Sequence, residues 1–324
     1  MPHLIDSTWL LLGLVLLYVG GEWLVRGARG VSLKMGITPL VVGLTVVAFG
    51  TSAPELLVSL QANLQGKGDM ALGNVVGSNI CNIALILGVG AAIRPMAVDP
   101  QILKRELPIL LAISIIFVAL LLQDDSISQW EGALFFIAVV TYSTLSIRRS
   151  RTEAQNLSRD SILTRQEEPD ESPGDHALLP NIGFILLGIG ALVYGADRLV
   201  LGGSNIARNM GVPEATIALT VVAFGTSLPE LATSIVAALR RQGDILIGNA
   251  VGSCIFNILC VVGLTSTIAP LGRTDDLRNM DLWVMLTLTL ILFPFLWSRR
   301  SLARGEGALL LAGYGGYVCY LALR

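Results

Sequence analysis

The chain contains 324 residues, of which 53% are hydrophobic and 14% charged, and its mean hydropathy is +0.69. Soluble domains carry about 25% charged residues, so this composition excludes a soluble globular protein and predicts one that crosses a lipid bilayer several times. The 22 basic and 24 acidic residues give a net charge of −2, which excludes a nucleic-acid partner. The two histidines, His3 and His176, lie near the N-terminus and in a polar loop, so a metal ion inside the membrane would have to be held by oxygen atoms.

Polar residues, glycines and prolines divide the chain into about ten predicted transmembrane helices. Their approximate spans are 8–28, 38–64, 70–92, 105–122, 129–147, 180–202, 213–239, 245–268, 281–297 and 306–323. Residues 148–179 are rich in Arg, Glu, Asp, Ser and Pro, and they cannot bury enough apolar surface to fold alone. The predicted fold class is therefore an all-α polytopic membrane protein, with one five-helix unit at 1–147, a cytoplasmic polar linker at 148–179 and a second five-helix unit at 180–324.

The distribution of lysine and arginine predicts the orientation, because these residues are more frequent in cytoplasmic loops than in external ones. With the N-terminus outside, the inward-facing loops hold 16 of them and the outward-facing segments hold five. We therefore expect an integral protein of the cytoplasmic membrane with both termini outside. We expect the lipid bilayer to surround its helices, and no obligatory protein partner is evident from the sequence.

An internal repeat is the strongest signal in the sequence. Leu44–Leu56 reads LTVVAFGTSAPEL and Leu219–Leu231 reads LTVVAFGTSLPEL, so 12 of 13 positions agree at an offset of 175. The same offset aligns residues 73–83 with residues 248–258. Because five helices separate the copies, the copies cross the membrane in opposite directions. Inverted repeats of this kind are typical of secondary transporters, whose binding site lies near the bilayer midplane.

Each repeat contains a proline inside a predicted membrane helix. Pro54 and Pro229 lack an N–H and clash with the carbonyl four residues earlier, so the second and seventh helices should break there. Freed carbonyls at membrane depth are tolerated only where they line a cavity or bind a ligand. The backbone at 48–51 and 223–226 is therefore a candidate ligand set, although a kink that serves only packing is the alternative.

Glutamates recur at equivalent positions of the two broken helices. An acid at the centre of a membrane helix costs about 2.5 to 3.5 kcal/mol, so Glu55 and Glu230 indicate function. Two carboxylates within about 6 Å would repel each other by roughly 3 kcal/mol at an effective dielectric of 20, so such a site requires cations or protons. Helical spacing adds four pairs of side chains one turn apart: Thr51 with Glu55, Thr226 with Glu230, Ser78 with Asn82, and Ser253 with Asn257. The alternative role of the Ser and Thr hydroxyls is hydrogen bonding to a backbone carbonyl one turn earlier.

An all-oxygen site with two carboxylates suits a hard divalent cation. Ca²⁺ accepts six to eight oxygen ligands in flexible geometry, whereas Mg²⁺ demands an octahedron and loses water reluctantly. Na⁺ is nearly the same size as Ca²⁺, so Na⁺ ions can compete for the same oxygens. We therefore expect Ca²⁺ and Na⁺ as transported ions and no resident cofactor.

The paired motifs GTSxPEL and GN(V/A)VGS(N/C)IxNI resemble the two alpha repeats of the calcium:cation antiporter superfamily, and the whole chain is similar to bacterial and archaeal sodium/calcium exchangers. The resemblance implies a Ca²⁺ site formed by the Glu55 and Glu230 carboxylates with the Thr51 and Thr226 carbonyls. It also implies a Na⁺ ligand set of Ala48, Thr51, Ser52, Glu55, Ser78, Asn82, Ala223, Thr226, Ser227, Glu230, Ser253 and Asn257.

One position departs from part of that superfamily. Some relatives, including potassium-dependent exchangers, carry an aspartate where this chain has Asn257, and this difference argues against K⁺ co-transport. The expected function is a secondary antiporter that extrudes Ca²⁺ with the Na⁺ gradient by alternating access, and a proton-coupled cation exchanger is the alternative. An intramembrane enzyme or a cation channel is disfavoured, because neither needs inverted repeats around a ring of hydroxyls.

Two further acids, Glu22 and Asp197, recur near the ends of the first and sixth helices. Glu22 can pair with Arg26 one turn later along the helix. A vestibule for cations is the alternative role of these acids.

Overall fold

The computed structural model describes residues 2–164, 178–211, 223–273 and 279–323. Within these ranges the protein is almost entirely helical, and seven helices are long and apolar enough to cross a membrane. The pair Pro39–Thr51 and Ala53–Leu64 forms an eighth, broken span. The remaining two predicted spans correspond to α12 (Leu228–Leu239) and α16 (Arg304–Leu323). The first part of the predicted seventh helix, 213–222, lies outside the described residues.

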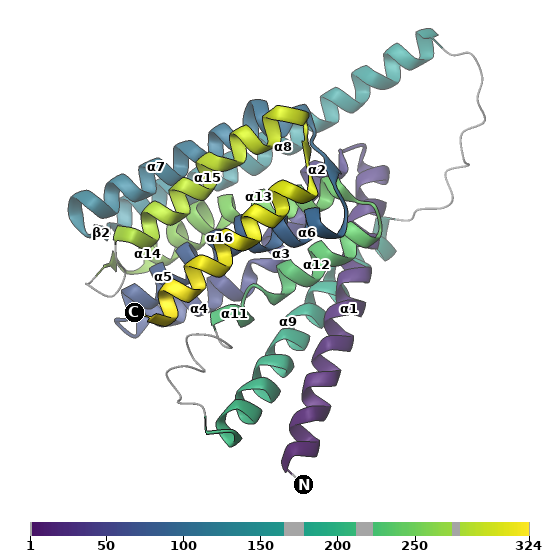
Figure 1. Cartoon of the computed structure of the whole chain (residues 1–324). Helices are drawn as coiled ribbons and strands as arrows, with labels where there is room; N and C mark the ends of the chain where they lie inside the picture. The colour runs from purple at the N-terminus through teal and green to yellow at the C-terminus, as the bar shows by residue number, and fades with distance from the viewer. Residues whose placement is uncertain (1, 165–177, 212–222, 274–278, 324) are drawn as a thin grey trace.

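The helices of the first repeat follow the predicted order (Figure 1). Successive elements of this repeat are α1 (Pro2–Met35), α2 (Pro39–Val42), the π-helical η1 (Gly43–Val47), α3 (Ala48–Thr51), α4 (Ala53–Leu64), α5 (Gly68–Ile80), the π-helical η2 (Cys81–Ile86), α6 (Leu87–Ile93), the π-helical η3 (Ile102–Glu106), α7 (Leu107–Asp124) and α8 (Gln129–Thr164).

The second repeat presents equivalent elements over its described residues. They are α9 (Leu178–Asn209), α11 (Ala223–Gly225), α12, α13 (Gly243–Phe256), the π-helical η5 (Asn257–Val262), α14 (Gly263–Ile268), α15 (Asn279–Arg299) and α16. Two short antiparallel pairings join loops of the two repeats: β1 (Met96–Ala97) with β4 (Ser301–Leu302), and β2 (Ser126–Ile127) with β3 (Leu271–Gly272).

Helix α8 extends beyond its predicted end at residue 147. It continues to Thr164, so helical structure enters the predicted polar linker at 148–179. The physical reason is that extending an existing helix adds one hydrogen bond per residue, whereas starting a new helix is costly. Residues 165–177 of the predicted linker lie outside the described residues.

Helices α1 and α9 lie side by side and antiparallel, as inverted repeats require (Figure 1). Glycines spaced by seven residues allow their backbones to approach closely. A Cβ at Gly13 would lie 2.8 Å from the Gly195 carbonyl oxygen, and a Cβ at Gly20 would lie 2.9 Å from the Gly188 carbonyl oxygen. Small residues at membrane-helix interfaces permit such contact, which brings more atoms within van der Waals range.

The interior of the molecule is formed by α13, whose residues from Ile245 to Phe256 are all buried. The first half of the broken span packs against it backbone to backbone. A Cβ at Gly248 would lie 2.6 Å from the Leu40 carbonyl oxygen, and a Cβ at Gly252 would lie 2.7 Å from the Leu44 carbonyl oxygen. The glycines of the second repeat therefore hold the broken helix of the first repeat in place.

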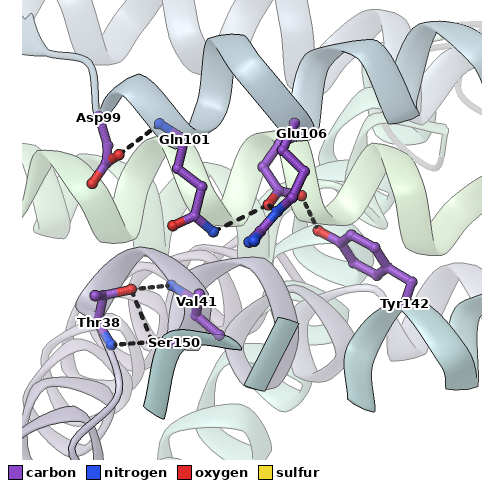
Figure 2. A network of polar contacts seen from close by, with 8 residues as sticks. Thr38, Val41, Asp99, Gln101, Glu106, Tyr142 and Ser150 are labelled. Carbon is purple, nitrogen blue, oxygen red and sulfur yellow. Dashed lines mark hydrogen bonds and ion pairs between the residues drawn. The ribbon is translucent and has the colours of Figure 1, made fainter. Parts of the chain in front are cut away.

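A buried polar network surrounds Glu106, and its hydrogen-bond and ion-pair partners in the described residues include no predicted ion ligand (Figure 2). Glu106 is fully buried, and its carboxylate accepts hydrogen bonds from Tyr142 Oη at 2.7 Å and Gln101 Nε2 at 3.2 Å. Arg105 forms an ion pair with it at 2.8 Å. This acid is compensated by a cation and hydrogen bonds, as a buried charge requires.

Glu22 does not form the predicted pair with Arg26. Its carboxylate instead pairs with Arg240 at 2.7 Å, because α1 packs against α12 and Arg240 lies at the C-terminal end of α12. The Arg26 guanidinium lies 4.8 Å from the centre of the Phe184 ring, where a cation–π contact stabilises it.

Candidate cation site

Both repeats break two residues before the proline at which a kink is predicted. Ser52 has φ −83° and ψ 6°, and Ser227 has φ −86° and ψ 4°, so neither serine is helical. The first break bends the span by 44° between its two halves. The predicted break of the second helix is therefore confirmed, and Ser227 has the same conformation between α11 and α12. Each proline occupies the first turn of the helix after its break, where the missing N–H costs nothing.

The two glutamates lie in the first turns of α4 and α12 and are buried. Glu55 is 0% exposed and Glu230 is 1% exposed. Their hydrogen bonds cross between the repeats: Ser52 Oγ donates to Glu230 Oε1 at 3.2 Å, and Ser227 Oγ donates to Glu55 Oε1 at 3.4 Å. Ser78 Oγ on α5 is a second donor to Glu55 Oε1, also at 3.4 Å. The fold therefore joins the two halves of the predicted site around the carboxylates.

Several oxygen atoms of this site have no hydrogen-bond partner. In the described part of the chain, nine buried side-chain nitrogen or oxygen atoms lack one, and five of them belong to predicted ion ligands. An unsatisfied buried polar atom costs about 1 to 3 kcal/mol, so a cluster of them needs an explanation. Cations bound by these atoms would supply it: Glu55 Oε2, Glu230 Oε2, Asn82 Oδ1, Asn257 Oδ1 and Ser253 Oγ.

The asparagines of the site occupy π-helical turns. Asn82 lies in η2, which interrupts the run from α5 to α6, and Asn257 begins η5, which interrupts the run from α13 to α14. Isolated π-helical turns inside α-helices are frequent at functional sites. Asn257 Nδ2 donates to Asn79 Oδ1 at 3.0 Å, which leaves Asn257 Oδ1 as the free end of the amide.

Thr51, Thr226 and Ala48 have hydrogen-bond partners in this structure. The Thr51 hydroxyl lies 3.1 Å from the Val47 carbonyl oxygen, one turn earlier, and also 3.1 Å from Asn249 Oδ1 in the other repeat, so intrahelical bonding is only one of its contacts. The Ala48 carbonyl oxygen accepts the Ser52 N–H at 3.0 Å. Thr226 is half-buried, and Ala223 begins the short helix α11.

Sequence reasoning missed three asparagines that contact the ligand residues. Asn74 on α5 and Asn249 on α13 bond to Thr226 and Thr51, and Asn79 bonds to Asn257. The alignment of the repeats could have identified two of them, because Asn74 and Asn249 follow equivalent glycines at the offset of 175.

Inverted helical repeats around a buried, acidic, oxygen-lined site define a membrane transporter of cations. The chain belongs to the sodium/calcium exchanger protein family, whose model matches residues 7–148 and 180–323. It is 37% identical over 319 residues to the putative antiporter CaxA of Alkalimonas amylolytica, covering 97% of this chain and 98% of that protein. It is 32% identical over 339 residues to the sodium/calcium exchanger MaX1 of Methanosarcina acetivorans, covering 96% of this chain and 97% of that protein.

The fold is also that of solved exchanger structures. The sodium-calcium exchanger NCX_Mj, soaked with Na⁺ and Sr²⁺, superposes with a TM-score of 0.82 at 29% identity and covers 98% of each chain. The predicted all-helical fold of inverted repeats is thereby confirmed. The protein is an integral membrane exchanger of cations.

Proposed function

We propose that the protein exchanges Na⁺ for Ca²⁺ across the cytoplasmic membrane by alternating access and extrudes Ca²⁺, without K⁺ and without catalysing a reaction. The observation that carries the proposal is the pair of buried glutamates, each with one carboxylate oxygen that lacks a partner. Two carboxylates neutralise one Ca²⁺. Three Na⁺ ions at the same oxygens would leave the site with a charge of +1, so either load removes most of the repulsion between the acids.

The proposed ligands follow the pairing of the repeats. Glu55 and Glu230 would bind Ca²⁺ with the carbonyls of Thr51 and Thr226, and Na⁺ would use the serine, asparagine and alanine positions of the predicted set as well. The choice of Na⁺ is supported by the hydroxyls of Ser52, Ser78 and Ser227, which surround the carboxylates. Hydroxyl oxygens are ligands for Na⁺, whereas proton transfer does not need them.

The direction and the orientation are parts of the same proposal. The excess of lysine and arginine in the loops predicted to face the cytoplasm supports a protein with both termini outside. An inward Na⁺ gradient would then drive Ca²⁺ out of the cell.

Proton coupling is the second candidate function. It is favoured by the same free carboxylate oxygens, Glu55 Oε2 and Glu230 Oε2, because each of them is a place for a proton. In this case the glutamates would be protonated during the return step, and the serine hydroxyls would only hold the carboxylates in place.

Flux of isotopic Ca²⁺ into proteoliposomes tests both candidates. Vesicles loaded with Na⁺ and diluted into Na⁺-free buffer should accumulate Ca²⁺, and a pH gradient alone should not drive uptake. Ca²⁺ uptake that is driven by the pH gradient and does not depend on Na⁺ would refute Na⁺ coupling and support H⁺ coupling. A strict requirement for K⁺ would refute K⁺ independence, and Ca²⁺ entry with no exchangeable ion inside would refute exchange altogether.

A further inference from the structure

Two asparagines outside the predicted ligand set bridge the halves of the site. Asn74 lies on α5 in the first repeat. Its Nδ2 donates to the Glu55 carbonyl oxygen at 3.2 Å and to Ser59 Oγ at 2.9 Å, both in its own repeat. Its Oδ1 accepts a hydrogen bond from Thr226 Oγ1 at 3.4 Å, in the opposite repeat. One side chain therefore holds α4 and the break of the other repeat together.

Asn249 on α13 makes the equivalent contacts in the opposite direction. Its Nδ2 donates to Ser234 Oγ at 3.4 Å, in its own repeat, and its Oδ1 accepts from Thr51 Oγ1 at 3.1 Å, in the first repeat. Asn249 is fully buried. Ser234 is the counterpart of Ser59 at the offset of 175, and Thr51 is the counterpart of Thr226.

The symmetry of these contacts separates them from ordinary packing. In each half an asparagine donates to the equivalent serine of its own repeat and accepts from the equivalent threonine of the other repeat, although not every buried position is matched between the halves. Asn79, for example, has Cys254 as its counterpart. A planar amide that donates to one repeat and accepts from the other fixes the separation of the two segments that it joins. These segments carry Glu55 with Thr226 on one side, and Thr51 with the helix of Glu230 on the other.

We propose that Asn74 and Asn249 are positioning residues that keep the two broken helices in register, so that both glutamates reach a single Ca²⁺ at the same time. The inference rests on the proposed function. One divalent ion must be contacted by both halves simultaneously, whereas Na⁺ ions can occupy separate places among the same oxygens. Loss of the bridges should therefore weaken Ca²⁺ binding more than Na⁺ binding.

Binding measurements on the purified full chain test this selectivity. Asn74→Ala and Asn249→Ala should each raise the Ca²⁺ Kd about tenfold, the effect of losing hydrogen bonds that are at least partly buried. The Ca²⁺ Kd is measured by titration calorimetry, and the Na⁺ concentration for half-maximal thermal stabilisation should change less than about threefold. If the asparagines only support the fold, the variants should lose Ca²⁺ affinity and Na⁺ affinity to the same extent, and that result would overturn the proposal.

A matched control comes from Asn63 at the end of α4. This buried asparagine also bonds across the repeats, with Nδ2 at 2.8 Å from the Ala269 carbonyl oxygen, but it contacts none of the proposed ligands. Asn63→Ala should leave both ion affinities unchanged. An equal loss of Ca²⁺ affinity in this control and in Asn74→Ala would refute the assignment.

The threonine partners keep the test decisive if an asparagine variant fails to fold. Thr226→Val and Thr51→Val remove the hydroxyls that bond to Asn74 and Asn249 and keep the backbone carbonyls, and Thr51→Val also removes the contact with the Val47 carbonyl oxygen one turn earlier. Each should raise the Ca²⁺ Kd, and Thr226→Val should add little in the Asn74→Ala background because both remove the same bridge. Additive effects, or Ca²⁺ affinities like that of the unmodified protein, would overturn the proposal. Failure of the proposed function would instead appear in the unmodified protein, as Ca²⁺ binding without Na⁺-driven flux.

Discussion

Neutralising one glutamate of the site should weaken Ca²⁺ binding by more than about a hundredfold while the protein stays folded. Glu55 is fully buried, its Oε1 accepts hydrogen bonds from two serines, and its Oε2 has no partner. Glu55→Gln keeps the shape and an acceptor oxygen for Ser78 and Ser227, but it leaves bound Ca²⁺ with one compensating carboxylate instead of two. Removing one partner of a buried charge pair costs about 3 to 5 kcal/mol. The Ca²⁺ Kd should therefore rise about 150- to 4,500-fold.

The same substitution should not destabilise the protein without ions. The unmodified site then holds two buried carboxylates that repel each other, and replacing buried charges by neutral groups of similar volume is often neutral or stabilising. Thermal unfolding in buffer free of Ca²⁺ and Na⁺ should show an unchanged or higher midpoint for Glu55→Gln. Added Ca²⁺ should raise the midpoint of the unmodified protein but not that of the variant.

Glu106→Gln is the control, because Glu106 is equally buried but lies in the separate network with Arg105 and Tyr142 (Figure 2). It should lower the midpoint of unfolding, because Arg105 loses its counter-charge, and it should leave the Ca²⁺ Kd unchanged. Near-normal Ca²⁺ affinity and Na⁺-driven flux in Glu55→Gln, or a loss of affinity of the same size in Glu106→Gln, would refute the assignment of the site.

Three further predictions follow from the ligand set and the packing. Protons compete with Ca²⁺ for the two carboxylates, so the apparent Ca²⁺ KM in flux assays should rise as the pH falls from neutral to mildly acidic, and a constant KM would contradict buried carboxylate ligands. External K⁺ should leave Na⁺-driven Ca²⁺ flux unchanged. Asn257→Asp puts a third acid in place of the amide whose Oδ1 is unpartnered, and it should change the preference among cations. K⁺ dependence of the unmodified protein would disprove this interpretation. Gly248→Ala places a Cβ 2.6 Å from the Leu40 carbonyl oxygen and should lower the free energy of unfolding by about 1 to 3 kcal/mol. Gly313→Ala should be tolerated, because no described atom lies within 4 Å of the added Cβ. Equal midpoints of thermal unfolding in the two variants would show that α2 does not pack on α13 as described.

The sequence by itself determined the class of fold and the two acids of the candidate site. Apolar segments long enough to span a bilayer are a property of composition, and the offset of 175 between the repeats is visible without coordinates. The breaks at Ser52 and Ser227 were predictable because a proline removes a hydrogen bond and crowds a carbonyl within four residues of itself. An acid that recurs in an apolar helix is expensive wherever the helix lies, so Glu55 and Glu230 could be identified from local chemistry alone.

The tertiary structure decided which groups are partners. Ser52 bonds to Glu230 in the other repeat rather than to Glu55 three residues later, and Glu22 pairs with Arg240 rather than with Arg26 one turn away. The bridges made by Asn74 and Asn249 likewise join residues more than 150 positions apart. Spacing along one helix specifies only which side chains share a face. Contacts between distant segments depend on how whole helices pack, and close glycine contacts such as that of Gly248 with the Leu40 backbone fix that packing to within a few ångströms.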